Sequence, residues 1–147
     1  MIDKSEQTEK NYNLQRFLEA QEHAYSYALE EIKRGRKESH WMWFIFPQLK
    51  SLGRSDMAQY YGIEDIKEAR AYINHSVLGA RLREISQALL ELDTDNPAQV
   101  MGYIDALKLR SCMTLFSKAT DDNDVFLRVL KKYFGGIEDS KTLIEIL

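Results

Sequence analysis

Apolar residues near the start of the chain recur at intervals of three or four. Over residues 14–32 this spacing places them on one face of a helix. Asn13 carries a side chain that often caps a helix start, and Gly35 is a typical residue for a helix end. The pattern therefore predicts one long amphipathic helix between these two residues.

The next apolar segment, residues 41–46, is hydrophobic almost without interruption. Pro47 follows it, disfavours helical geometry at Phe46 and removes one backbone donor. A continuous apolar run does not by itself separate a helix from a buried strand. The pattern leaves strand, short helix and irregular structure open for this segment.

Capping residues predict two short helices in the middle of the chain. Ser55 is placed to cap a helix that continues to Tyr61 and ends at Gly62. Asp65 and Glu68 then have capping-box spacing and begin a helix that runs to about residue 74.

The second half of the chain repeats the helical pattern. An apolar stripe over residues 77–92 predicts a helix, and Asn96 followed by Pro97 opens another. Gly135 and Gly136 end the last long helix, and residues 142–147 add a helical turn. The side chains expected to face inward are Ile104, Leu107, Ser111, Leu115 and Phe116, then Phe126, Val129, Leu130, Tyr133 and Phe134.

No run of alternating apolar and polar residues predicts a sheet, so the expected fold is all-α. We expect a single compact multi-helix domain over residues 14–147. Residues 1–13 are expected to form a flexible segment before it. The composition agrees, because 147 residues with 44% hydrophobic and 29% charged side chains suit one ordered domain.

Charge and cysteine usage narrow the possible partners and location. A formal net charge of -3 leaves no large basic field for duplex nucleic acid. The single cysteine, Cys112, forms no internal disulfide, which suits a reducing compartment.

No secretory or membrane-spanning apolar run is visible, so we expect a cytoplasmic protein without a membrane partner. Metal-binding and phosphate-loop motifs are missing, so we expect no metal and no cofactor.

The segment of residues 37–49 has the most unusual composition. Trp41, Trp43 and Phe46 could stack against a planar ligand, while Lys37, His40 and Gln48 could hold its polar edges. The alternative is that the aromatic residues form the centre of the core, which is the more frequent role of such clusters. From the residues alone, this alternative is favoured.

A second group of polar residues lies on the helix that follows Tyr103. Asp105 and Lys108 are three residues apart, beside Cys112, with Ser111 on the flank. Such a pair is more often a surface ion pair than a catalytic device. Glu22 and His23 similarly fit a solvated helix face.

The residues His-Trp-Met-Trp-Phe-Ile-Phe-Pro-Gln at positions 40–48 resemble the bacterial domain-of-unknown-function family 1810. The similarity extends over nearly the whole chain and includes residues 17–21, Gly35, Lys37, residues 52–55, residues 68–72, His75, Leu78, Gly79, Arg81, Leu82, Asp105, Lys108, Ser111, residues 113–116, Tyr133, Phe134 and Gly136. That family looks like a branch of the YbiA-like superfamily. The resemblance implies an all-helical fold shared with NADAR proteins, enzymes associated with cleaving N-glycosidic bonds in ribosylated metabolites or ADP-ribosylated bases.

This resemblance makes an N-glycosidase-type hydrolase the leading hypothesis, acting on a nucleotide- or ADP-ribose-like small molecule. NADAR proteins carry a Glu-His pair in an early helix, and Glu22 with His23 has the same letters. An oxocarbenium-like transition state needs a carboxylate, for which we expect Asp105 first and Glu22 second. The expected ligand-binding residues are Lys37, His40, Trp41, Trp43, Phe46, Gln48, Arg54, Lys108 and Ser111.

Two other classes of function fit the same sequence. A noncatalytic module could bind or sense the same nucleotide derivative without breaking a bond. A helical protein-interaction domain would instead expose an apolar patch and show no response to small molecules.

Overall fold

The computed structural model describes residues 12–147, which form helices joined by short loops and contain no strand. The helices are α2 (Gln15–Lys33), α3 (Met42–Ile45), η1 (Lys50–Leu52, a 3-10 turn), α4 (Asp56–Tyr61), α5 (Ile66–Asn74), α6 (Leu78–Leu90), α7 (Pro97–Met101), α8 (Tyr103–Ala119), α9 (Asp124–Phe134) and α10 (Ser140–Glu145). The predicted all-α fold is confirmed. The expected flexible segment, residues 1–13, lies almost entirely outside the described residues.

The predicted caps explain where several helices begin. The Ser55 side chain accepts a hydrogen bond from the backbone N–H of Ala58 at 3.1 Å, and Asp65 accepts one from Glu68 at 2.9 Å. Asn96 accepts from Ala98 at 3.0 Å, with Pro97 in the first helical position. These three helix starts are therefore set locally, by side chains that satisfy otherwise unpaired backbone donors.

Most of the apolar segment of residues 41–46 forms the short helix α3. The sequence pattern had left strand, short helix and irregular structure open for this segment. Phe46 leaves helical geometry, with φ −123° and ψ 71°, directly before Pro47. After it, Leu49 pairs with Ile63 in an isolated parallel bridge. The segment therefore turns sharply inside the molecule instead of continuing as a long element.

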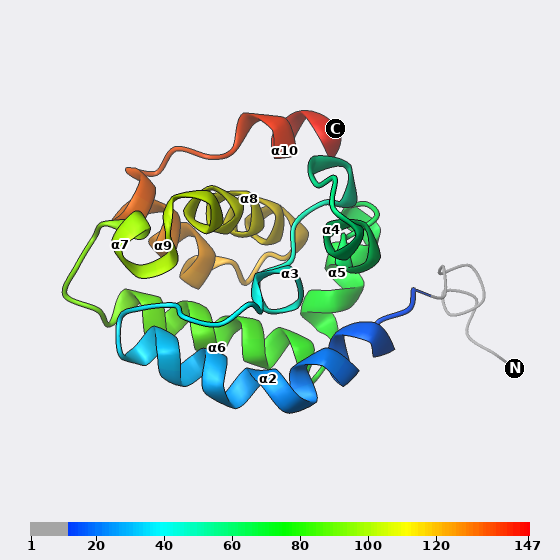
Figure 1. The fold of residues 1–147 in the computed structure, drawn as a ribbon. Coiled ribbons are helices and arrows are strands. Elements are labelled where there is room, and N and C mark those ends of the chain that lie inside the picture. The colour runs from blue at the N-terminus through cyan, green and yellow to red at the C-terminus, as the bar shows by residue number, and fades with distance from the viewer. Residues whose placement is uncertain (1–11) are drawn as a thin grey trace, which may run out of the picture.

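Helix α8 lies at the centre of the packing. It contacts α5, α7, α9 and α10, while α2 packs against α3 and α6. Figure 1 shows α2 and α6 side by side below α8, with α10 crossing above it. No helix within residues 12–147 has the length and apolar character needed to cross a lipid bilayer.

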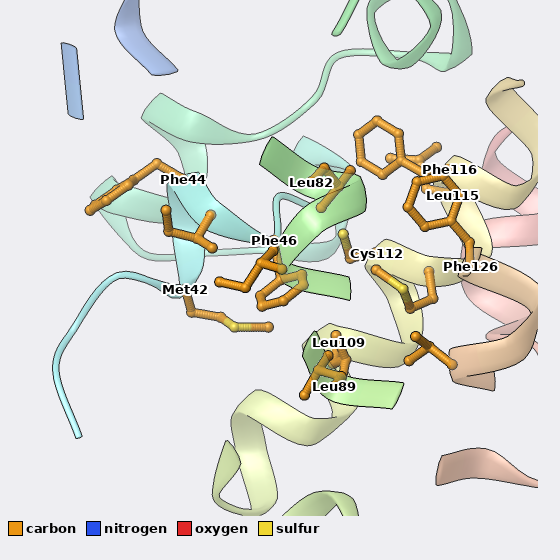
Figure 2. Close-up of a cluster of buried hydrophobic side chains, with 14 of the residues drawn as sticks. Met42, Phe44, Phe46, Leu82, Leu89, Leu109, Cys112, Leu115, Phe116 and Phe126 are labelled. Carbon is orange, nitrogen blue, oxygen red and sulfur yellow. The ribbon is translucent and has the colours of Figure 1, made fainter. Parts of the chain in front are cut away.

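Side chains from distant parts of the chain meet in one core. Figure 2 shows Met42 and Phe46 from the α3 region, Leu82 from α6, and Cys112 and Phe116 from α8 in the same buried cluster. All of these side chains are at most 2% exposed. Burial of this kind is the main stabilising contribution to the fold.

The prediction of which α8 side chains face inward is wrong for the first turns of the helix. Ile104 is 67% exposed and Leu107 is 45% exposed, whereas Ala106 and Leu109 are buried. Positions 106, 109, 113 and 116 have the same helical spacing as the expected stripe, and packing selects that second stripe. Ser111, Leu115 and Phe116 are buried as expected.

A buried ion pair fastens the start of α2 to the α4–α5 region. Arg16 Nη1 lies 2.9 Å from Glu68 Oε2, and both side chains are less than 10% exposed. Arg16 also donates to the carbonyl oxygens of Tyr60 at 2.8 Å and Gly62 at 3.0 Å. Glu68 accepts from the backbone N–H of Glu64 at 2.7 Å. Because both charges are satisfied by several partners, this pair serves the fold.

Candidate functional site

The aromatic segment divides into a buried part and a part at the surface. Trp41 and Phe46 are at most 1% exposed and belong to the core. Trp43 and Gln48 are only partly buried, and His40 is exposed. In this conformation, Trp43 is therefore the tryptophan that a ligand can reach.

Glu31 holds the loop that leads into this segment. Its carboxylate accepts hydrogen bonds from the backbone N–H groups of Glu38 at 2.8 Å and Ser39 at 2.9 Å. It also accepts from the Ser39 hydroxyl at 2.6 Å and the Trp41 indole at 2.9 Å. Burial by itself raises the pKa of Glu31, but these hydrogen bonds outweigh it and lower the pKa from 4.5 to about 2.

Glu31 was not among the expected site residues, although the sequence contains a signal for it. Ala24, Ala28 and Glu31 follow the spacing of one buried helix face, so the glutamate stands where an apolar residue is expected. A charged side chain on a buried face needs partners. The nearby serine and tryptophan supply them.

The Lys37 side chain extends from this loop to helix α8. Its ammonium nitrogen lies 3.0 Å from Asp105 Oδ2 and donates to the carbonyl oxygen of Ser39 at 2.5 Å. The same nitrogen lies 4.8 Å from the centre of the Trp41 ring. The Lys37 side chain is only 8% exposed, so the loop and α8 enclose it.

Asp105 lies between two lysines. Its second oxygen, Oδ1, is 3.8 Å from the Lys108 nitrogen, which lies 5.8 Å from the centre of the Trp43 ring. Asp105 is 22% exposed and Lys108 is 29% exposed. The structure thus brings together four residues from the predicted set, which we call the Asp105 cluster: Lys37, Trp43, Asp105 and Lys108.

Two spaces of different size adjoin the Asp105 cluster. One, which we call the cleft, is lined by residues 35–37 and 98–102 and has a volume of about 590 Å³. That volume is in the range of small-molecule sites. Lys37 lies in its wall.

The second space, which we call the crevice, lies between α3, α4 and α8. Its lining includes Trp43, Phe46, Gln48 and Lys108. Its volume is only about 10 Å³, which is room for about one water. A ligand group would therefore rest at its mouth unless α3 and α4 separate.

The remaining predicted residues form no described bond with Asp105 or are buried in the fold. Glu22 is exposed on α2, and Arg54 is exposed after η1. No hydrogen bond or ion pair within residues 12–147 joins Glu22, His40 or Arg54 to Asp105. Ser111 is buried and donates to the carbonyl oxygen of Leu107 at 3.3 Å.

Comparison with known proteins places the chain in a family. Residues 11–146 match the family described as "Protein of unknown function (DUF1810)", and the chain belongs to it. The crystal structure of the conserved hypothetical protein Rv1873 from Mycobacterium tuberculosis is similar, with a TM-score of 0.91 and 44% sequence identity. The alignment covers 93% of this chain and 98% of that one. No curated protein matches the chain.

Proposed function

We propose that this protein is a small-molecule hydrolase that cleaves the N-glycosidic bond of a nucleotide- or ADP-ribose-like compound. The observation that carries the proposal is the position of Asp105. Its partly exposed carboxylate contacts Lys37, which lines the cleft, and Lys108, which lines the crevice. A ligand that extends from one space to the other would pass this carboxylate.

The chemistry requires negative charge beside the sugar carbon. When the bond between the anomeric carbon and the base nitrogen breaks, its electron pair leaves with the base, and positive charge develops on the sugar ring. Asp105 stabilises that charge, and when water adds to the anomeric carbon the Asp105 carboxylate accepts the proton that the water loses. Lys108 donates a hydrogen bond to the departing base or supplies its proton.

The aromatic residues have different roles in this proposal. Trp43 stacks against the base, because part of its surface is open. The Gln48 side chain lines the crevice and forms no hydrogen bond with a described residue, so its amide is available for a polar edge of the base. Trp41 and Phe46 support the site from behind.

The assignment also draws on similarity between families. The chain belongs to the DUF1810 family, and we infer that this family is related to YbiA-like and NADAR proteins, which are associated with N-glycosidic bond cleavage. Glu22 stays a candidate acid on this ground. It is exposed on α2 and forms no described contact with the Asp105 cluster, so Asp105 is the stronger candidate.

A noncatalytic binding module is the second candidate. The observation in its favour is that, within residues 12–147, no second carboxylate makes contact with Asp105, Lys37 or Lys108. Many glycosidases use two carboxylates. A binding module would use the same cleft and leave the ligand intact.

A product assay separates these candidates. Purified protein is incubated with NAD, ADP-ribose, nucleosides and flavin precursors, and free base is measured by chromatography and mass spectrometry. We expect base release that falls at least about 100-fold in Asp105→Asn, with circular dichroism as the test of folding. Equal rates in wild type and Asp105→Asn would remove Asp105 as the catalytic carboxylate, and loss of activity in Glu22→Gln alone would assign that role to Glu22.

Two other outcomes contradict hydrolysis. Recovery of an intact ligand that raises the melting temperature identifies a binding module. No response to any compound instead favours a protein partner, for which Tyr103, Ile104 and Leu107 are exposed apolar side chains at the start of α8.

A further inference from the structure

A run of basic residues, Lys-Arg-Gly-Arg-Lys, occupies positions 33–37 at the end of α2. Two of its four basic residues, Arg36 and Lys37, line the cleft. Lys37 is paired with Asp105. Arg36 is exposed and forms no ion pair with any residue that the structure describes. The lining of the cleft therefore includes an arginine whose charge no described carboxylate neutralises.

The second lining segment of the cleft, residues 98–102, supplies a hydrogen-bond donor. Gly102 has φ 84° and ψ 157°, a conformation that is open mainly to glycine, and no atom lies within 4 Å of the position that a Cβ would occupy there. Gly102 therefore leaves this part of the cleft free of a side chain, and helix α8 begins directly after it. The Gln99 side-chain oxygen already contacts Thr94 Oγ1 at 3.1 Å, which leaves the Gln99 amide NH₂ group to donate.

We propose that the cleft binds a pyrophosphate group, held by the Arg36 guanidinium group and the Gln99 amide, which come from its two lining segments. Arginine pairs with phosphate oxygens through two parallel hydrogen bonds, and a primary amide donates to a phosphate oxygen. The choice of ligand rests on the proposed function, because the two linked phosphates of an ADP-ribose-like compound would lie in the cleft while its glycosidic bond lies beside Asp105.

The charge around the cleft favours a short anion over a long one. Glu30 and Glu38 flank the basic run, are more than 60% exposed and both pair with Arg34. These carboxylates would repel a polyanion that continued past the cleft. A pyrophosphate group reaches Arg36 without extending over them.

Titration with inorganic pyrophosphate tests the site, with ADP and adenosine as paired probes. The variant is Arg36→Ala, and the matched control is Arg34→Ala, which removes the same charge two positions away without altering the lining of the cleft. Isothermal titration should show that Arg36→Ala weakens pyrophosphate and ADP binding at least about tenfold. Arg34→Ala should stay within about twofold of wild type.

A spectroscopic measurement keeps the test valid if Arg36→Ala folds poorly. In wild-type protein, pyrophosphate should shift the amide signals of residues 35–37 and 99–104 in a nitrogen–proton spectrum. Absence of pyrophosphate binding, equal weakening by both arginine variants, or equal affinity for ADP and adenosine would overturn the proposal. Shifts confined to other residues would overturn it as well.

Failure of this site and failure of the proposed function are distinguishable. If pyrophosphate binds through Arg36 while no ribosylated compound is cleaved, the anion site stands and the hydrolase proposal fails. If base release depends on Asp105 but pyrophosphate does not bind in the cleft, the hydrolase stands and the anion site fails.

Discussion

The two tryptophans of the aromatic segment are two residues apart and have opposite surroundings. Trp41 is fully buried, and its indole N–H donates to Glu31, which also accepts three other hydrogen bonds. Trp43 is partly exposed beside the Lys108 ammonium group, which pairs only loosely with Asp105. We call the first region the Glu31 region and compare it with the Asp105 cluster.

The difference lies in how completely the polar groups are satisfied. In the Glu31 region, the carboxylate forms no ion pair with any residue from 12 to 147, and neutral donors saturate it in a buried position. In the Asp105 cluster, the carboxylate and Lys108 remain partly open to solvent. Saturated polar groups fix the fold, whereas open ones are available for a ligand. The same short sequence therefore supports both structure and the candidate site.

The largest expected effect is on the buried tryptophan. Trp41→Ala should lower the free energy of unfolding by about 3–5 kcal/mol, because it empties a large core volume. Trp43→Ala is the matched control and should cost less than about 2 kcal/mol, since its side chain is partly exposed. Urea unfolding measures both values. Equal losses in the two variants would remove the distinction between the regions.

Replacing the saturated carboxylate should have the next largest effect. Glu31→Gln should destabilise the protein by about 2–3 kcal/mol, because an amide cannot accept at both ends and leaves buried donors unpaired. Glu30→Gln, on the exposed side of the same helix, should change stability by less than about 0.5 kcal/mol. If urea unfolding gives similar values for both variants, the hydrogen bonds to Glu31 do not hold the loop.

The pKa of Glu31 predicts an acid dependence of stability. Because the pKa is lowered to about 2 in the folded protein from an ordinary 4.5, the stabilisation is present above pH 4.5 and is lost as the pH falls toward 2. Wild type should lose roughly 2 kcal/mol over this interval through this group. Glu31→Gln should lack that part of the loss when unfolding is followed by circular dichroism. A parallel pH dependence in both proteins would argue against the lowered pKa.

The smallest effect on stability is expected at Lys108. Lys108→Ala should change the free energy of unfolding by less than about 0.5 kcal/mol, because the ammonium group is partly exposed and 3.8 Å from its partner. Urea unfolding measures this change. A loss of several kcal/mol would show that Lys108 supports the fold like Glu31, which would contradict an open site.

Local features of the fold were predictable from the sequence. The caps at Ser55, Asp65 and Asn96, and the helix end at Gly135, depend on residues within a few positions of each other. The inward face at the start of α8 was predicted wrongly, because two apolar stripes share the helical spacing there and only the packing of other helices selects one.

The arrangement of the site depends on contacts that the sequence does not show. Lys37 and Asp105 are far apart in the chain and meet only because α8 packs beside the loop after α2. Lys37, Trp43 and Lys108 were expected at one site with Asp105, but the spacing in the sequence does not show that Asp105 lies beside the aromatic segment. Arg36 was missed because an exposed arginine in a basic run has no sequence feature that places it beside a cleft.

The most direct test compares the melting temperatures of wild type and Lys108→Ala with and without ADP-ribose. At about a hundredfold excess over its dissociation constant, the ligand should raise the wild-type melting temperature by about 5 °C or more. Lys108→Ala should melt like wild type without ligand and lose most of that increase. The same increase in both proteins, or none in wild type, would contradict a ligand site at the Asp105 cluster.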